Sequence, residues 1–266
     1  MANKINKKEI PLLFGKPSDK ALFDPKDFLT KERRNGLETD LAVFFFSSKV
    51  AKEIEEHLKV KINLMDTENP RFHISQVGNK RVLFARSHIG GPAAGTILEE
   101  VIELGAKKIL FVGSTGALQK YEIGSIMIPA KAIRDEGTSY HYLKAGKYSY
   151  PSKALAKELE DICKYSKISY HKGATWTTDA PFRETLRKVE KCRKEGVMCV
   201  EMEAASLFAI ATHRKVQVAG IFWVSDLLLK DKWSEHFDSK EYIDGAKNAY
   251  GIVKKYLEKE TSERFK

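Results

Sequence analysis

Apolar residues fall into two kinds of pattern along this chain. Continuous apolar runs, often rich in Val, Ile and Phe, predict buried strands over 41–46, 107–112, 122–133, 169–175, 197–200 and 216–224. Apolar positions spaced three or four residues apart predict helices over 47–58, 92–104, 152–165, 183–195, 203–215 and 239–258. A hairpin is predicted around Gly78 and Asn79, and the stretch 227–237 after Asp226 is expected to be a loop. Because strands alternate with helices through most of the chain, the pattern indicates an α/β fold.

The segment 197–228 contains the clearest unit of this kind. A short strand is followed by a helix that is apolar on nearly all sides, and then by a strand apolar on both faces. This order predicts a βαβ unit with parallel strands, whose carboxyl ends lie at the same edge of the sheet. Glu203 and Asp226 follow these two strands, so they are expected to face one crevice. The same pattern fits equally well with Glu203 as a helix cap and Asp226 as the start of a turn.

Composition narrows the class of protein. The 266 residues carry a formal net charge of +10, but the lysines are scattered among glutamates and form no basic block, so no nucleic-acid partner is expected. Three cysteines without a Cys-x-x-Cys pair predict reduced thiols and a cytoplasmic protein. No signal peptide and no membrane span are predicted, because no apolar run is long enough. We expect one domain over 1–266, in which residues 1–40 form an irregular N-terminal extension.

Two sequence motifs resemble a known family. "VEMEAASLFAIA" from Val200, followed by "VSD" ending at Asp226, is similar to the nucleoside phosphorylases, the trimeric-to-hexameric group that includes purine nucleoside and uridine phosphorylases and related nucleosidases. The resemblance covers about residues 80–255. It implies a three-layer α/β/α domain around a mixed, mostly parallel sheet. It also implies that Met202 and Glu203 hold the ribose and that Asp226 is the catalytic residue that protonates a purine base.

The phosphate-binding residues follow from two glycine-containing loops. Gly90 and Gly91 precede a predicted helix N-terminus, where amides can bind an anion, and "IGGPAA" resembles a family loop. Ser114 and Thr115 match family hydroxyls that bind phosphate and sugar. The family's phosphate loop after the first strand is replaced by Phe46-Ser47-Ser48-Lys49, and the family's phosphate arginine is replaced by Phe111. Arg86, at the end of a strand, is a hypothesis for the missing charge, although strand alternation could equally point it away.

The family's base-recognition loop matches residues 177–185. Phe182 could stack on a base and Arg183 could hydrogen-bond to one. The same residues equally fit an ordinary helix cap led by Thr178 or Asp179.

Together these features predict a pentosyltransferase that cleaves a purine nucleoside with phosphate, as in purine salvage. A nucleosidase, a uridine-type phosphorylase and a nucleoside-binding protein without turnover are the alternatives. No cofactor and no metal are expected. The predicted partners are a nucleoside, inorganic phosphate and further copies of the chain in a homo-oligomer.

Overall fold

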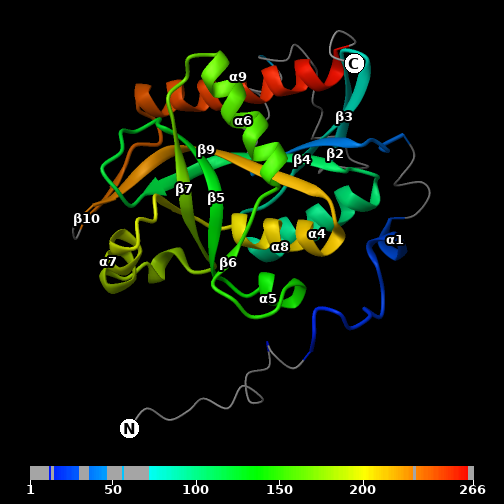
Figure 1. Cartoon of the computed structure of the whole chain (residues 1–266), viewed down its shortest axis with the longest axis horizontal. Coiled ribbons are helices and arrows are strands. Elements are labelled where there is room, and N and C mark those ends of the chain that lie inside the picture. The colour runs from blue at the N-terminus through cyan, green and yellow to red at the C-terminus, as the bar shows by residue number, and fades with distance from the viewer. Residues whose placement is uncertain are drawn as a thin grey trace.

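A mixed sheet with helices on both faces forms the body of the protein (Figure 1). The computed structural model describes residues 12, 15–29, 36–46, 56, 72–229 and 232–262. The strands are β1 Leu41–Phe45, β2 Phe72–Val77, β3 Lys80–Arg86, β4 Lys108–Ala117, β5 Ile126–Asp135, β6 Tyr148–Ser149, β7 Tyr170–Thr178, β8 Cys199–Glu201, β9 Gln217–Leu229 and β10 Lys232–Glu235. The helices are α1 Pro25–Phe28, α4 Gly91–Glu103, α5 Ser139–Tyr142, α6 Lys153–Tyr165, η3 Pro181–Arg183, α7 Leu186–Lys194, α8 Ala204–Arg214 and α9 Lys240–Thr261.

The helices form two layers over the sheet. Leu155 and Leu159 of α6 and Ile252 and Tyr256 of α9 pack on one face. The apolar sides of α4 and α8 pack on the other face, where Phe208 lies against strand residues. The three-layer α/β prediction with a mixed sheet is therefore confirmed, and the longest ladders, β4–β9 and β5–β7, are parallel.

Part of the sheet closes on itself. The strand order is β10-β9-β5-β7-β8-β4-β1-β3-β2, and β4 also pairs with β9 along its whole length. The strands β9, β5, β7, β8 and β4 therefore form a ring. The pairings that complete the ring are short, with two residue pairs in β5–β9 and two in β4–β8.

This closure corrects the predicted βαβ unit. β4 is parallel to β9 but antiparallel to β8, so β8 and β9 run in opposite directions and the prediction of parallel strands is wrong. The end of β8 and the part of β9 around Asp226 still lie close together, because Gly116 of β4 pairs with Val200 on one side and with Asp226 on the other. A register shift between Thr115 and Gly116 sets this alignment.

Most other predicted elements match the structure. The hairpin around Gly78 is β2–β3, and the predicted helices over 152–165 and 239–258 are α6 and α9. The stretch after Asp226 was expected to be a loop, but β9 continues to Leu229 and pairs with β10. The predicted helix over 47–58 falls outside the described residues except for Glu56.

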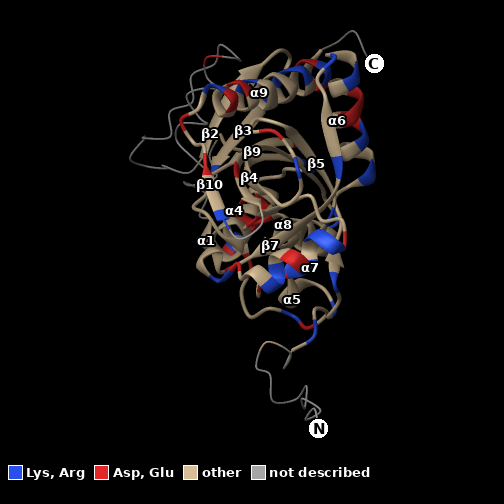
Figure 2. Ribbon diagram, turned by 90° about the vertical axis from the view of Figure 1, so that its left-hand side faces the viewer, with Lys and Arg blue, Asp and Glu red and all other residues tan. Residues whose placement is uncertain are grey.

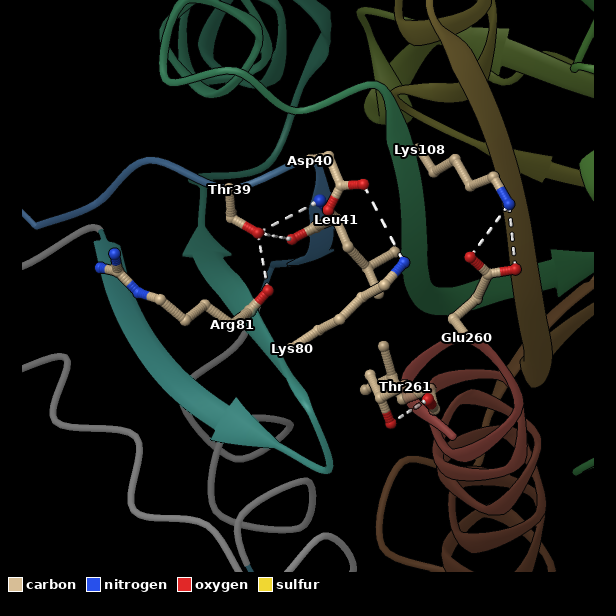
Figure 3. Close-up of polar contacts among 9 residues, drawn as sticks. Thr39, Asp40, Leu41, Lys80, Arg81, Lys108, Glu260 and Thr261 are labelled. Atoms are coloured by element: carbon tan, nitrogen blue, oxygen red, sulfur yellow. Dashed lines mark hydrogen bonds and ion pairs between the residues drawn. The ribbon is translucent and has the colours of Figure 1, made fainter. Parts of the chain in front are cut away.

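Polar contacts fasten the end of the sheet at which β1 and β4 begin (Figure 3). The Thr39 hydroxyl donates to the Arg81 carbonyl at 2.6 Å. The Lys108 ammonium contacts both carboxylate oxygens of Glu260 on α9, at 2.9 and 3.0 Å. These contacts fix the C-terminal helix at the end of β4 opposite to Gly113–Gly116.

The surface charges are dispersed. Figure 2 shows Lys and Arg on the outer sides of α6, α7 and α9, with acidic residues among them. The three cysteines, Cys163, Cys192 and Cys199, are free and buried. None of the described helices is both long and apolar enough to cross a membrane.

Candidate active site

A cavity of about 580 Å³ opens at one end of the strand ring. Its polar wall is formed by β4, by the segment after β8, and by the part of β9 around Asp226. Four carboxyl groups line it, namely Glu184, Glu201, Glu203 and Asp226. Its apolar wall includes six aromatic side chains, namely Phe46, Phe182, Trp223, Trp233, Phe237 and Tyr242. A partly apolar cavity with a few converging polar groups is the usual form of a small-molecule site.

The structure brings six of the predicted site residues together. Those that line the cavity are Met202, Glu203, Ser114, Thr115, Phe182 and Asp226. Four others lie outside the lining, namely Arg86, Gly90, Gly91 and Arg183. Phe182 is fully exposed at the mouth, because η3 carries it beyond the edge of the sheet.

Glu203 is positioned by the turn between β8 and α8. Its side chain is buried, and its Oε1 accepts a hydrogen bond from the Gly90 amide at 2.7 Å. Burial raises the pKa of Glu203, and the charge of Glu201 raises it further, to about 8. The prediction that Glu203 simply caps the helix does not hold, because its side chain makes no capping bond.

Glu201 makes the capping contacts instead. Its Oε2 accepts from the backbone amides of Glu203 and Ala204, at 2.7 and 2.6 Å. Its Oε1 accepts from the hydroxyls of Thr177 and Thr175, at 2.6 and 3.2 Å. Burial raises the pKa of Glu201, and these four donors offset only part of that effect. Because hydrogen bonds to a carboxylate favour its charged form, the donors favour a negative charge on Glu201 over one on Glu203.

Asp226 is held by two donors. The Ser225 hydroxyl donates to Oδ1 at 2.7 Å, and the Trp233 indole N–H donates to Oδ2 at 2.8 Å. The β9–β10 hairpin supplies this indole, because Glu235 of β10 pairs with Asp226. Gly116 leaves room for the carboxyl group, since an added Cβ would lie 2.8 Å from Oδ2.

Glu184 is a site residue that the sequence did not reveal. It follows η3, is partly buried, and lines the same cavity as Asp226. Burial raises its pKa, and the charge of Asp226 adds to this effect, to about 7. The available signal was its position beside Phe182 and Arg183 in the predicted base-recognition loop.

Several of the residues predicted to bind phosphate make other contacts in the structure. The Gly90 amide donates to Glu203, and the Thr115 hydroxyl donates to the Val200 carbonyl at 2.7 Å. The backbone of Arg86 pairs with Phe45 in the sheet, and Arg86 does not line the cavity. Among the described residues that line the cavity there is no Lys, Arg or His. Lys49 lies outside the described part of the chain.

The described residues also contain no group of three or more His, Cys, Asp or Glu side chains suited to a metal ion. The lining side chains of the cavity offer acid–base chemistry and hydrogen bonding by carboxyl groups, hydroxyls and indoles.

Comparison with known proteins identifies the family. The Phosphorylase superfamily matches residues 40–258. The chain belongs to this superfamily. The predicted family is thus confirmed. Relatives of this phosphorylase-superfamily chain include nucleoside phosphorylases. These enzymes are pentosyltransferases, as predicted.

Two curated relatives illustrate the range of bases. The guanosine phosphorylase of Halorubrum lacusprofundi is 29% identical over 142 residues, which are 53% of this chain and 59% of that protein. The uridine phosphorylase of Thermococcus kodakarensis is 31% identical over 158 residues, which are 53% of this chain and 56% of that protein. The chain thus spans little more than half the length of these two relatives.

A solved structure confirms the fold. The uridine phosphorylase of Vibrio fischeri matches with a TM-score of 0.73 at 22% identity, and the match covers 84% of this chain and 93% of that one. At this identity the likeness concerns the fold alone.

Proposed function

We propose that this protein cleaves the N-glycosidic bond of a purine nucleoside with inorganic phosphate, giving the free base and a pentose 1-phosphate. The carrying observation is that one cavity is lined by Met202 and Glu203, which follow β8, and by Asp226, which lies within β9. The two groups that the chemistry needs, a sugar-binding carboxyl group and an acid for the leaving base, thus have access to one ligand. Such a reaction fits purine salvage.

The base-binding end of the cavity is acidic. Asp226 and Glu184 line it together, and the raised pKa of Glu184, about 7, lets Glu184 carry a proton near neutral pH. A purine leaves as its N7 receives a proton or a strong hydrogen bond, so we assign Asp226 as the acid. Phe182, at the mouth, is placed to stack on the base.

The sugar-binding end is formed by the turn after β8. Glu203 binds the ribose hydroxyls, and Met202 packs beneath the sugar ring. Positive charge that develops on the sugar during bond cleavage is stabilised by the nearby carboxyl groups, including Glu201.

Phosphate is assigned to the end of β4. Ser114 and Thr115 line the cavity there, as do Gly113 and Gly116. The Thr115 hydroxyl can still accept a hydrogen bond, although its proton is directed to Val200. The positive charge needed for tight phosphate binding comes from outside the described lining, and we propose that another copy of the chain supplies it in a homo-oligomer.

A nucleosidase is the second candidate function. The observation that favours it is the lining itself, in which the described residues include four acidic side chains and no cation. A dianion is repelled by such a wall, whereas water is not.

One assay separates these candidates. Release of free base from inosine, guanosine, adenosine and uridine is measured with and without inorganic phosphate, with Asp226→Asn as the low-activity control. Phosphorolysis requires base release that depends on phosphate and yields pentose 1-phosphate. Equal rates without phosphate, with free ribose as product, would establish hydrolysis. Rapid uridine cleavage without purine cleavage would refute the purine assignment, and nucleoside binding without turnover would refute both reactions.

A further inference from the structure

Two buried carboxyl groups stand two residues apart at the beginning of α8. The side chains of Glu201 and Glu203 are 6% and 5% exposed, and both line the cavity. They receive very unequal support. Glu201 accepts four hydrogen bonds, two from amides at the helix N-terminus and two from threonine hydroxyls. Glu203 accepts one at 2.7 Å from the Gly90 amide, and the Met202 backbone adds a weaker contact.

We propose that Glu201 is a positioning residue that keeps Glu203 in its neutral, protonated form in the ligand-free protein. The amides of Glu203 and Ala204 and the Thr177 hydroxyl stabilise a charge on Glu201, and the helix dipole adds to that effect. A second negative charge in the same buried space is unfavourable, so the two groups share one charge. Glu203, the group with fewer donors, takes the proton.

The elements packed against α8 carry other charged or titratable groups. They are Glu99, Glu100 and Glu103 of α4, Lys131, Arg134 and Asp135 of β5, His141 of α5, His171 and Lys172 of β7, and Asp226 of β9. Glu136 contacts Ser206 of α8, and Glu184 lines the same cavity. Burial is the largest cause of the raised pKa of Glu203, and the charge that adds to it comes from Glu201. The pair therefore acts largely by itself.

The neutral form changes how the sugar is held. This step rests on the proposed function, in which Glu203 binds ribose. A carboxylic acid donates one hydrogen bond and still accepts others, whereas a carboxylate only accepts. Protonated Glu203 can thus donate to one ribose hydroxyl while its other oxygen accepts from Gly90. The negative charge that stabilises a cationic sugar remains available on Glu201.

The test is a titration of Glu203 in the ligand-free, full-length protein. The carboxyl carbons of ¹³C-labelled glutamates are followed by NMR against pH, and the Glu203 signal is assigned by its loss in Glu203→Gln. We expect a midpoint near 8. A midpoint in the ordinary range of glutamate, about 4.3, would overturn the proposal.

Substitution of Glu201 tests the cause. In Glu201→Gln the neighbouring charge is gone, and we expect the Glu203 midpoint to fall by about one pH unit or more. An unchanged midpoint in a folded variant would overturn the role of Glu201. The amide of this variant faces several donors and lowers stability, so a second pair of variants is needed. Thr177→Val removes a donor to Glu201, and Thr177→Ser keeps it. The change in chemical shift of the Glu203 carboxyl carbon near pH 8 should be smaller in Thr177→Val and unchanged in Thr177→Ser. Equal changes in both variants would count against the proposal.

Kinetics link the titration to ribose binding. We expect KM for the nucleoside to rise above the Glu203 midpoint in wild type, and the rise to begin at lower pH in Glu201→Gln. If KM did not change with pH around the measured midpoint of Glu203, the role of this proton in ribose binding would be refuted. Since the NMR titration needs no substrate, a protein that cleaves no nucleoside would refute the proposed function while the charge-sharing inference is still decided by the titration.

Discussion

The strongest quantitative prediction concerns the pH dependence of stability. Folding raises the pKa of Glu203 from 4.5 to about 8, so the folded protein binds this proton more tightly than the unfolded chain. The stabilisation is fully present below pH 4.5 and is lost as the pH rises to 8. A difference of this size corresponds to about 5 kcal/mol of the free energy of unfolding, as an upper value.

Glu203→Gln isolates this contribution. The glutamine is neutral at every pH and keeps an oxygen that can accept from the Gly90 amide. At pH 5 the variant and the wild type should unfold at similar urea concentrations. At pH 8.5 the variant should be more stable by several kcal/mol. Glu184, whose pKa is raised to about 7, contributes in the same direction in both proteins and cancels in the difference.

The assay is urea denaturation at a series of pH values, followed by tryptophan fluorescence. Glu122→Gln, a substitution of an exposed glutamate, serves as the matched control and should leave the pH dependence unchanged. If wild type and Glu203→Gln differ by the same free energy at pH 5 and pH 8.5, Glu203 carries no extra proton and the reasoning fails.

Three further substitutions test the cavity. Asp226→Asn should slow cleavage of inosine or guanosine by about 10²–10⁴-fold while sparing nucleosides with a good leaving group, and equal losses on both would contradict the acid role. Trp233→Phe removes the donor to Asp226 Oδ2 and should change the pH profile of kcat. The free energy of unfolding in urea should fall by about 1 kcal/mol or less, because the ring is more than half exposed. A large loss of stability with an unchanged pH profile would contradict this prediction. Gly116→Ala should reduce both stability and activity, because its Cβ would lie 2.6 Å from Leu228 Cδ1 and 2.8 Å from Asp226 Oδ2; full activity by the same assay would show that Asp226 tolerates displacement.

The parts of the fold that depend on local pattern were predictable. Apolar runs located the buried strands, and periodic spacing located helices such as α6 and α9. The sequence also placed Glu203 and Asp226 in one crevice, although the stated reason was wrong, since β8 and β9 run in opposite directions. The direction in which distant strands pair depends on tertiary packing, and the hydrophobic pattern of each strand alone does not predict it.

The parts of the site that depend on tertiary contacts were not predictable. Trp233 reaches Asp226 because β10 folds back on β9, and the polar stretch between them indicated a loop. Glu184 acquires its raised pKa through burial in the assembled cavity. Glu201, in the motif before Met202, gave no sign of its four donors, because two of them come from β7.

The closed ring also determines when the cavity can form. The segments that seal it, 108–117 and 217–229, are far apart in the chain. Bringing them together has an entropic cost that grows with the length of the connecting chain, and the reward comes only when the β4–β9 ladder forms. During synthesis, β4 emerges with one edge unpaired until β9 follows. Gly116 and Asp226 therefore pair only once β9 is in place, and a chain truncated before β9 lacks the wall of the cavity that carries Asp226.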